Sequence, residues 1–267
     1  MKGPPMENKT ALVIDKVDKS FSVKTGKKSE VGLLQVLRAI SMSVMEGEII
    51  GLLGPSGCGK STLLNIVAGF EQPDKGEVLF QGEPVVIPAP ERSVLFQSAV
   101  LFPWFTVKEN IVYGLRNRRE NQGIIEKKYC QYVQLVGLKG FDNYYPNQLS
   151  GGMQQRAALA RALIMEPRML LMDEPFAALD AQTRMLMQQL LLGISEQIKP
   201  TILFITHDIE EALILSDRIL VMSKLPGKII YEVTVPFSRP RDLSMIGSYG
   251  FAKMKDEIRQ YLFDQLL

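Results

Sequence analysis

Hydrophobic and polar positions along the chain predict strands that alternate with helices. Continuous apolar runs of strand length occupy residues 48–53, 169–173 and 202–206. Apolar residues with helical spacing occupy 61–68 and 124–136. Strands that are buried on both faces read as near-continuous apolar runs, and their alternation with helices is typical of parallel sheets. The pattern therefore predicts an α/β fold whose mainly parallel sheet is covered by helices on both faces.

Shorter elements are expected around this core. Thr106 and Glu109 have the spacing of a capping box, which predicts that a helix begins there. The other expected elements are a strand at 11–14, a loop at 24–30, a hairpin made from 77–80 and 85–87, a strand at 93–97, and a tail at about 233–267 that ends in an amphipathic helix.

Composition narrows the class of protein. The 267 residues are ample for one domain with an inserted subdomain, and a net charge of +2 gives no sign of a nucleic-acid surface. Cys58 and Cys130 are the only cysteines, which fits a reducing compartment. No apolar run approaches the ~18 residues that span a bilayer, and the first ten residues lack an apolar signal region. Any membrane process would therefore need other chains to do the crossing.

One glycine-rich segment predicts a phosphate-binding loop. Residues 54–61 fit the pattern G-x-x-x-x-G-K-[ST] between a predicted strand and a predicted helix. Lys60 is expected to reach the β- and γ-phosphates of a nucleotide, and the Ser61 hydroxyl to hold Mg²⁺. Cys58 is interpreted as a small residue tolerated in the loop, because no second cysteine pairs with it. The predicted binding residues are Gly54, Pro55, Ser56, Gly57, Cys58, Gly59, Lys60, Ser61 and Thr62.

Two carboxylates end a predicted buried strand. Asp173 and Glu174 close the run 169–173, and ligands of open α/β sheets bind at such strand ends. Asp173 suits the Mg²⁺ shell, and Glu174 is then placed to orient or deprotonate the attacking water. A solvated acidic turn is the alternative interpretation, and it is weaker here because the phosphate-binding loop demands an acidic partner of this kind.

A further segment points to one family. Residues 149–156 read Leu-Ser-Gly-Gly-Met-Gln-Gln-Arg, which resembles the signature of ABC ATPases and precedes the acidic strand as it does there. Met153 departs from the glutamine that many members carry. The resemblance covers roughly residues 10 to 230. It assigns Gln97 to the Q-loop, Asp180 to the D-loop, His207 to the switch histidine, and Phe21 to the aromatic position that stacks on adenine; core packing is the alternative for Phe21.

The resemblance implies a fold and a set of roles. The expected fold is a P-loop NTPase (RecA-like) core with a small antiparallel β subdomain and an inserted α-helical subdomain. The expected domains are 1–232, with the helical part at about 99–165, and the tail 233–267. Ser150, Gly151 and Gly152 would cap the ATP held by the opposite chain of a dimer, and Asp180 would communicate across it. The expected catalytic residues are Lys60, Gln97, Glu174 and His207, the expected Mg²⁺ contacts are Ser61, Gln97 and Asp173, and the cofactors are ATP and Mg²⁺.

His207 is the only histidine of the chain. It follows a predicted buried strand, so a contact with the γ-phosphate is favoured over the role of an ordinary surface or core residue. A metal-ligand role is disfavoured, because no histidine or cysteine cluster accompanies it.

The kind of ABC ATPase follows from what accompanies these motifs. The chain has no coiled-coil heptads, one ATPase unit and no fused membrane-spanning segment, which resembles the stand-alone subunits of bacterial importers. The segments 101–105, 225–228 and 236–241 resemble the branch that imports nitrate, sulfonates or taurine. The cluster 101–105 is expected to dock a permease, with an internal hydrophobic staple as the alternative.

The expected partners are a second copy or paralogue, transmembrane permease subunits and, indirectly, an extracytoplasmic solute-binding protein, with no nucleic acid. The expected location is peripheral, at the cytoplasmic face of the cell membrane. Two other functions stay open: a soluble ABC-type ATPase that acts on nucleic acid or ribosomes, and a regulatory nucleotide-binding module without turnover. The complete set of expected catalytic residues argues against the regulatory module without turnover.

Overall fold

A computed structural model describes residues 9–25 and 30–263 of the chain. Residues 26–29 of the predicted loop, residues 264–267 of the predicted tail and the first eight residues lie outside this part. Within the described ranges, no helix combines the length and apolar character needed to cross a bilayer.

Six strands form the central sheet, and five of them run parallel. The order is β10-β9-β3-β8-β7-β6, with only β10 antiparallel to its neighbour. This confirms the predicted fold class. The bounds are β3 Ile49–Leu53, β6 Arg92–Leu95, β7 Met169–Asp173, β8 Thr201–Ile205, β9 Arg218–Met222 and β10 Ile229–Thr234.

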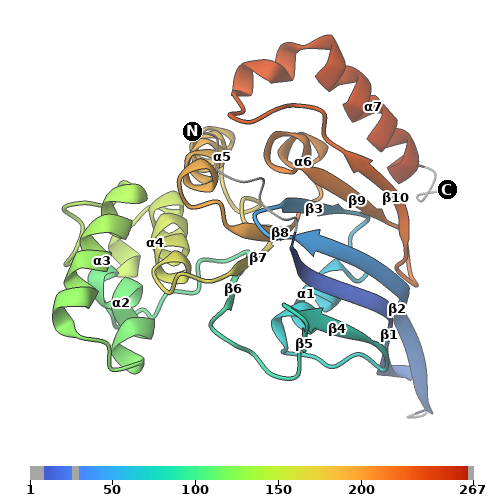
Figure 1. The fold of residues 1–267 in the computed structure, drawn as a ribbon, viewed down its shortest axis with the longest axis horizontal. Helices are drawn as coiled ribbons and strands as arrows, with labels where there is room; N and C mark the ends of the chain where they lie inside the picture. Colours follow the sequence, from blue (N-terminus) through green and yellow to red (C-terminus); the bar gives the residue numbers. More distant parts are fainter. Residues whose placement is uncertain (1–8, 26–29, 264–267) are drawn as a thin grey trace.

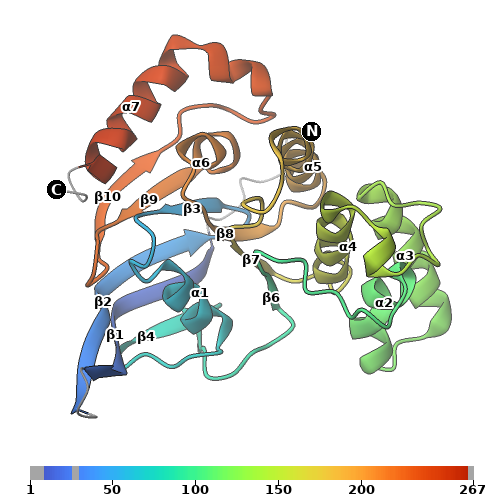
Figure 2. The same cartoon turned by 180° about the vertical axis from the view of Figure 1, so that it is seen from behind.

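Both faces of this sheet are buried, which explains the near-continuous apolar runs. Successive side chains of a strand point to opposite faces. Leu52 therefore packs in one hydrophobic cluster with Leu63 of α1 (Lys60–Ala68), whereas Leu53 packs in the other with Leu191 of α5 (Ala181–Ile198). Figures 1 and 2 show α1 on the side of the second sheet, and α5 on the far side with α6 (Ile209–Leu215).

The second sheet is antiparallel, with the order β2-β1-β4-β5. Its strands are β1 Thr10–Thr25, β2 Glu30–Met45, β4 Lys75–Phe80 and β5 Glu83–Pro84. The strand predicted at 11–14 is thus far longer, because the whole of β2 pairs with it. The hairpin after β4 returns at 83–84 rather than 85–87, and Val86 and Ile87 are exposed there.

Three helices lie between β6 and β7 and extend away from the edge of the central sheet (Figure 1). They are α2 Val107–Asn117, α3 Gln122–Leu135 and α4 Gly151–Leu163, with a short 3-10 turn, η1 Pro146–Gln148, before α4. The predicted capping box is present: Glu109 N–H donates to Thr106 Oγ1 at 3.3 Å, and Thr106 N–H donates to Glu109 Oε2 at 2.9 Å.

The C-terminal segment covers α6. It contains a short turn, η2 Leu243–Gly247, and the helix α7 Tyr249–Phe263. Phe251, Met254 and Ile258 of the predicted amphipathic face are buried in the same core as residues of α6. Figures 1 and 2 show α7 lying over α6. The predicted boundaries of the helical subdomain and of the tail stay a prediction.

Candidate nucleotide-binding site

The glycine-rich loop joins β3 to α1, as its sequence pattern predicts. Gly59 caps α1 with φ of 104°, a left-handed conformation that side chains strain. A Cβ at this position would lie 2.8 Å from Leu37 Cδ2 and 2.9 Å from Val36 Cγ1. Gly59 is therefore required both by its backbone and by the close approach of β2.

Lys60 is held inside this loop. Its side chain is buried, and Nζ donates to the carbonyl oxygens of Gly54 at 2.8 Å and Pro55 at 2.9 Å. The first turn of α1 has no acidic residue and no side-chain cap, so its free N–H groups and the ammonium provide positive potential together. Such a loop and helix end suit phosphate oxygens.

Cys58 is buried in the same loop, with Sγ 4.0 Å from Lys60 Nζ. Burial raises the pKa of its thiol, despite the nearby ammonium. A buried thiol with a raised pKa is a poor nucleophile, which supports the structural interpretation of this residue.

Ser61 and Asp173 meet at the carboxyl end of β7. Ser61 Oγ donates to Asp173 Oδ1 at 3.1 Å, although 112 positions separate them. Burial raises the pKa of the Asp173 carboxyl above its usual value, because desolvation destabilises the carboxylate, and a cation beside it would offset that cost. Among the described residues, no group of three or more His, Cys, Asp or Glu side chains could hold a metal. One hydroxyl and one carboxylate fit Mg²⁺, which keeps several waters and takes its other ligands from phosphates.

Glu174 and His207 face each other beside this pair. Glu174 Oε2 lies 3.2 Å from His207 Nδ1, and the His207 side chain is 59% exposed. Glu174 has φ of 43°, an uncommon left-handed conformation for a non-glycine residue, and its N–H donates to Ile205 O at 3.0 Å. This turn ends β7 and directs the Glu174 carboxylate toward His207, in the loop after β8.

The loop that carries His207 is held by buried polar contacts. Thr206 Oγ1 donates to Glu211 Oε2 at 2.6 Å and accepts from Asp208 N–H at 3.0 Å. Arg184 of α5 lies 3.7 Å from carboxylate oxygens of both Asp208 and Glu211. The two residues on either side of His207, Thr206 and Asp208, are therefore held in place by side-chain contacts.

A cavity of about 320 Å³ joins the phosphate-binding loop to the second sheet. Phe21 of β1 lines it, and Lys19 Nζ lies 5.1 Å from the centre of the Phe21 ring. Ser56, Gly57, Gly59, Lys60, Ser61, Thr62 and Glu174 line it as well. The structure thus brings the predicted adenine-stacking residue and the predicted phosphate-binding residues to one cavity.

Other predicted site residues lie elsewhere on the chain. Gln97 is exposed just after β6 and does not line this cavity. Ser150 caps α4, its Oγ accepting from Met153 N–H at 3.3 Å, and Asp180 caps α5. Neither lines the cavity, so their predicted contacts with a second chain's nucleotide stay a prediction. The helix ends do meet: a Cβ on Gly152 would lie 2.4 Å from Thr183 Cγ2.

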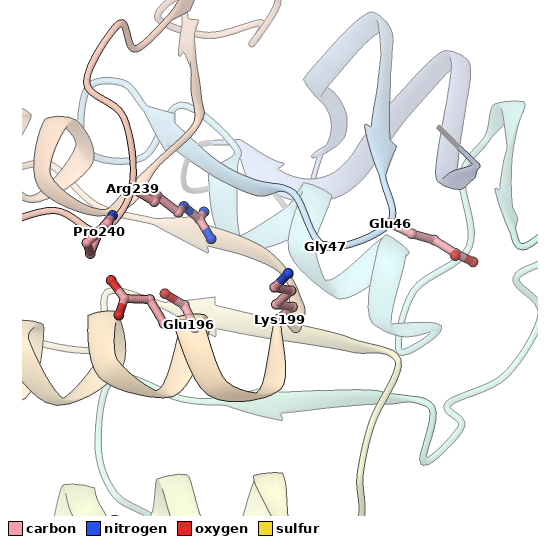
Figure 3. A pocket seen from close by; sticks show the side chains of 7 residues that line it. Glu46, Gly47, Glu196, Lys199, Arg239 and Pro240 are labelled. Atoms are coloured by element: carbon pink, nitrogen blue, oxygen red, sulfur yellow. The ribbon is translucent and has the colours of Figure 1, made fainter. Parts of the chain in front are cut away.

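A larger cavity of about 520 Å³ lies away from these residues. Glu196, Lys199 and Arg239 line it, as Figure 3 shows, together with the turn at Gly47 that precedes β3. It sits near the amino ends of β3 and β8, whereas ligands of open α/β sheets bind at the carboxyl ends. Arg239 is also engaged, with Nη2 2.6 Å from Asp217 Oδ2. The cavity of about 320 Å³ at the phosphate-binding loop is therefore the better candidate for a nucleotide site.

Sequence reasoning missed the residues that hold these loops in place. Gln155 of α4 contacts a distant loop, and Arg184 of α5 pairs with Glu211 of α6, so these residues connect segments that are far apart in the chain. Glu211 had one available signal, an acidic residue immediately before the apolar positions 212–215. The two others look like ordinary helical polar residues until their partners are known.

The parallel sheet, the glycine-rich loop and the acidic strand end define a P-loop protein that binds and hydrolyses ATP. The sequence model of the family described as "ABC transporter" matches residues 37–177, which is more than half of the chain. Together with the relatives below, this match shows that the chain belongs to the ABC transporter family, as the resemblance predicted.

Three relatives align with most of this chain. It is 43% identical over 249 residues to the aliphatic sulfonates import ATP-binding protein SsuB of Bacillus cereus, covering 92% of this chain and 94% of that protein. It is 47% identical to the taurine import ATP-binding protein TauB of Pelagibacter ubique, covering 77% of each. It is 43% identical to the nitrate import ATP-binding protein NrtD of Synechococcus elongatus, covering 84% and 83%.

A solved structure shares the fold. The ATP-binding cassette MJ0796, in a dimeric post-hydrolysis state bound to ADP and Pi, superposes with a TM-score of 0.71 at 30% identity. The match covers 85% of this chain and 100% of that one.

Proposed function

We propose that this chain is the ATP-hydrolysing subunit of an importer for a small solute of the nitrate, sulfonate or taurine kind. One observation carries the proposal: the phosphate-binding loop, the Ser61–Asp173 pair and the Glu174–His207 pair converge at the carboxyl ends of β3, β7 and β8. The import functions in the names of the relatives support the solute class.

The residues divide the work of phosphoryl transfer. Lys60 and the N–H groups of the loop would bind the β- and γ-phosphates, and Ser61 and Asp173 would hold Mg²⁺, which supplies charge neutralisation at the phosphates. Glu174 would accept a proton from the attacking water or orient it. His207, hydrogen-bonded to Glu174, would contact the γ-phosphate, and Phe21 would stack on adenine. Catalysis would rest mostly on positioning and charge stabilisation.

Two chains would form the working unit. Ser150 and the glycines after it leave free N–H groups at the start of α4, a suitable contact for a phosphate held by another chain. Dimerisation of the related cassette MJ0796 supports this arrangement. Closure of the dimer around two ATP molecules would favour one conformation of the permease, and hydrolysis would reopen the dimer.

An aromatic cluster is the proposed docking surface for the permease. Phe102 contacts Trp104 with ring centres 5.7 Å apart, and Tyr113 at 4.8 Å. Phe102 and Phe105 are partly covered, whereas the Trp104 side chain is 67% exposed and Tyr113 42%. An internal staple would bury its aromatic residues, so the exposure of Trp104 favours a contact with another protein.

The decisive experiment is a mild-detergent pull-down of the tagged chain from its own cells, with partners identified by mass spectrometry. The proposal predicts recovery of a multi-span membrane protein, and the solute-binding protein associated with it would narrow the solute. Trp104→Ala should lower that recovery about tenfold, since a buried aromatic anchor contributes about 1.4 kcal/mol or more at an interface. Tyr249→Ala, which removes another highly exposed aromatic on α7, is the matched control. Recovery of only ribosomes or nucleic-acid proteins would contradict the importer function and favour the soluble ATPase.

A further inference from the structure

Gln155 is a buried polar side chain whose contacts cross the molecule. It lies on α4, five positions after Ser150, and is 3% exposed. Its Nε2 donates to Pro175 O at 2.9 Å and to Phe96 O at 3.5 Å. Because both acceptors are carbonyl oxygens, the amide NH₂ group must face them, and each of its two hydrogens has one acceptor.

The two carbonyl groups belong to loops that carry proposed catalytic residues. Phe96 O is part of the peptide unit that leads into Gln97, and Pro175 lies immediately after Glu174. Both loops sit at carboxyl ends of neighbouring strands, β6 and β7. The side chain of Gln155 is therefore a bridge between these two loops, built from a third element, α4.

The same helix begins at the proposed contact with the second chain. Five residues of an α-helix rise about 7.5 Å, so Ser150 and Gln155 move as parts of one rigid unit. Gly152 packs against Thr183, in the first turn of α5, which places the start of α4 beside the Asp180 cap. A displacement of the α4 N-terminus would thus pull on the Gln97 and Glu174 loops at once.

We propose that Gln155 is a positioning residue for ATP hydrolysis, which holds the Gln97 loop and the Glu174 turn in fixed places relative to the start of α4. This inference rests on the proposed function, because it assigns Gln97 and Glu174 their catalytic roles. Gln155 touches no substrate in this account. It acts through the two backbone carbonyls, and the cost of leaving a buried NH₂ group unpaired keeps all three segments together.

The test is steady-state ATP hydrolysis by Gln155→Met, which keeps the length of the side chain and removes both donated hydrogen bonds. We expect kcat to fall about tenfold, while the Kd for ATP, measured with a fluorescent analogue, stays within about twofold. Gln188→Met is the matched control, because Gln188 is a buried glutamine of the neighbouring helix α5 outside these loops. Its kcat should stay near wild type at a similar change in Tm.

A double-mutant comparison separates positioning from a general loss of stability. If Gln155 acts through the Gln97 loop, Gln155→Met should cost much less in a Gln97→Ala background than in the wild type, and if it acts through the Glu174 turn the same holds in a Glu174→Gln background. Should Gln155→Met fail to fold, Gln155→Leu replaces it, since its apolar side chain is of similar size and donates no hydrogen bond. A wild-type kcat, an equal loss in Gln188→Met, or additive effects in both double mutants would each overturn the inference.

Wild type and Glu174→Gln are measured in the same series, so the proposed ATPase site and the proposed role of Gln155 are tested separately. Hydrolysis by the wild type and its near loss in Glu174→Gln uphold the proposed ATPase site, whatever Gln155→Met does. If the wild type does not hydrolyse ATP, or Glu174→Gln hydrolyses it normally, the assigned site fails and this inference fails with it.

Discussion

Glu174→Gln is the substitution that tests the site most directly. It removes one negative charge and the ability to accept a proton, and it keeps the shape of the side chain. Among the residues that the structure describes, the side chain of Glu174 hydrogen-bonds to His207 Nδ1 alone, at 3.2 Å, and a glutamine amide can still hydrogen-bond there. Because the Glu174 side chain is 24% exposed, the free energy of unfolding should change by less than ~1 kcal/mol.

The expected kinetic effect is large by comparison. General-base catalysis contributes about 10²–10⁴ to a rate. Glu174 is held by a strained turn and paired with His207, so its geometry supports a value inside that range rather than below it. We expect kcat to fall by about 10³, which corresponds to ~4 kcal/mol in the activation barrier. The Kd for ATP should stay within about twofold, because Lys60 and the loop provide the phosphate contacts.

The assay combines phosphate release with size-exclusion chromatography in ATP and Mg²⁺. Glu174→Gln should elute at about twice the mass of one chain when ATP is present, since ATP that is not hydrolysed would hold the dimer closed. Glu126→Gln is the control, because it neutralises an exposed carboxylate that pairs with Lys108 far from the cavity. Normal turnover in Glu174→Gln would refute the reasoning and require another base.

Two further predictions concern the loop and the dimer. Lys60→Ala removes a buried ammonium, whose charged hydrogen bonds contribute about 2 kcal/mol, so the Kd for ATP should rise roughly thirtyfold in equilibrium binding; wild-type affinity would count against the phosphate-binding assignment. Ser150→Arg should leave ATP binding by the isolated chain within about twofold and lower turnover about a hundredfold, because it obstructs the neighbour's site. Loss of ATP binding by the isolated Ser150→Arg chain would contradict an action across the dimer.

Local spacing was enough to predict the phosphate-binding loop and several elements. The strand before Gly54 and the helix after Lys60 lie within a few residues of the motif, so one short segment determines both the turn and its chemistry. The capping box at Thr106 and Glu109 is local in the same sense, because both partners belong to one helical turn. The Asp173–Glu174 end of β7 was also predicted, because two charged residues after an apolar run indicate the end of a buried strand.

The family resemblance extended the prediction to residues that no local pattern singles out. Gln97, Asp180 and Phe21 look like ordinary residues by composition and spacing alone, and only the signature at 149–156 gave them roles. Those roles, like the boundaries near 99, 165 and 232, stay predictions that the proposed experiments address.

The tertiary structure decided which of these residues meet. Glu174 and His207 are 33 positions apart, and they pair only because β7 and β8 are neighbours in the sheet. Phe21 reaches the cavity because the long strand β1 pairs with β2, an extent that the apolar pattern at 11–14 did not predict. Gln155 bridges two loops, 59 and 20 positions away, that one helix happens to reach. Sequence spacing determines contacts within a turn or a strand, whereas contacts between distant segments depend on strand order and packing, which only the folded chain specifies.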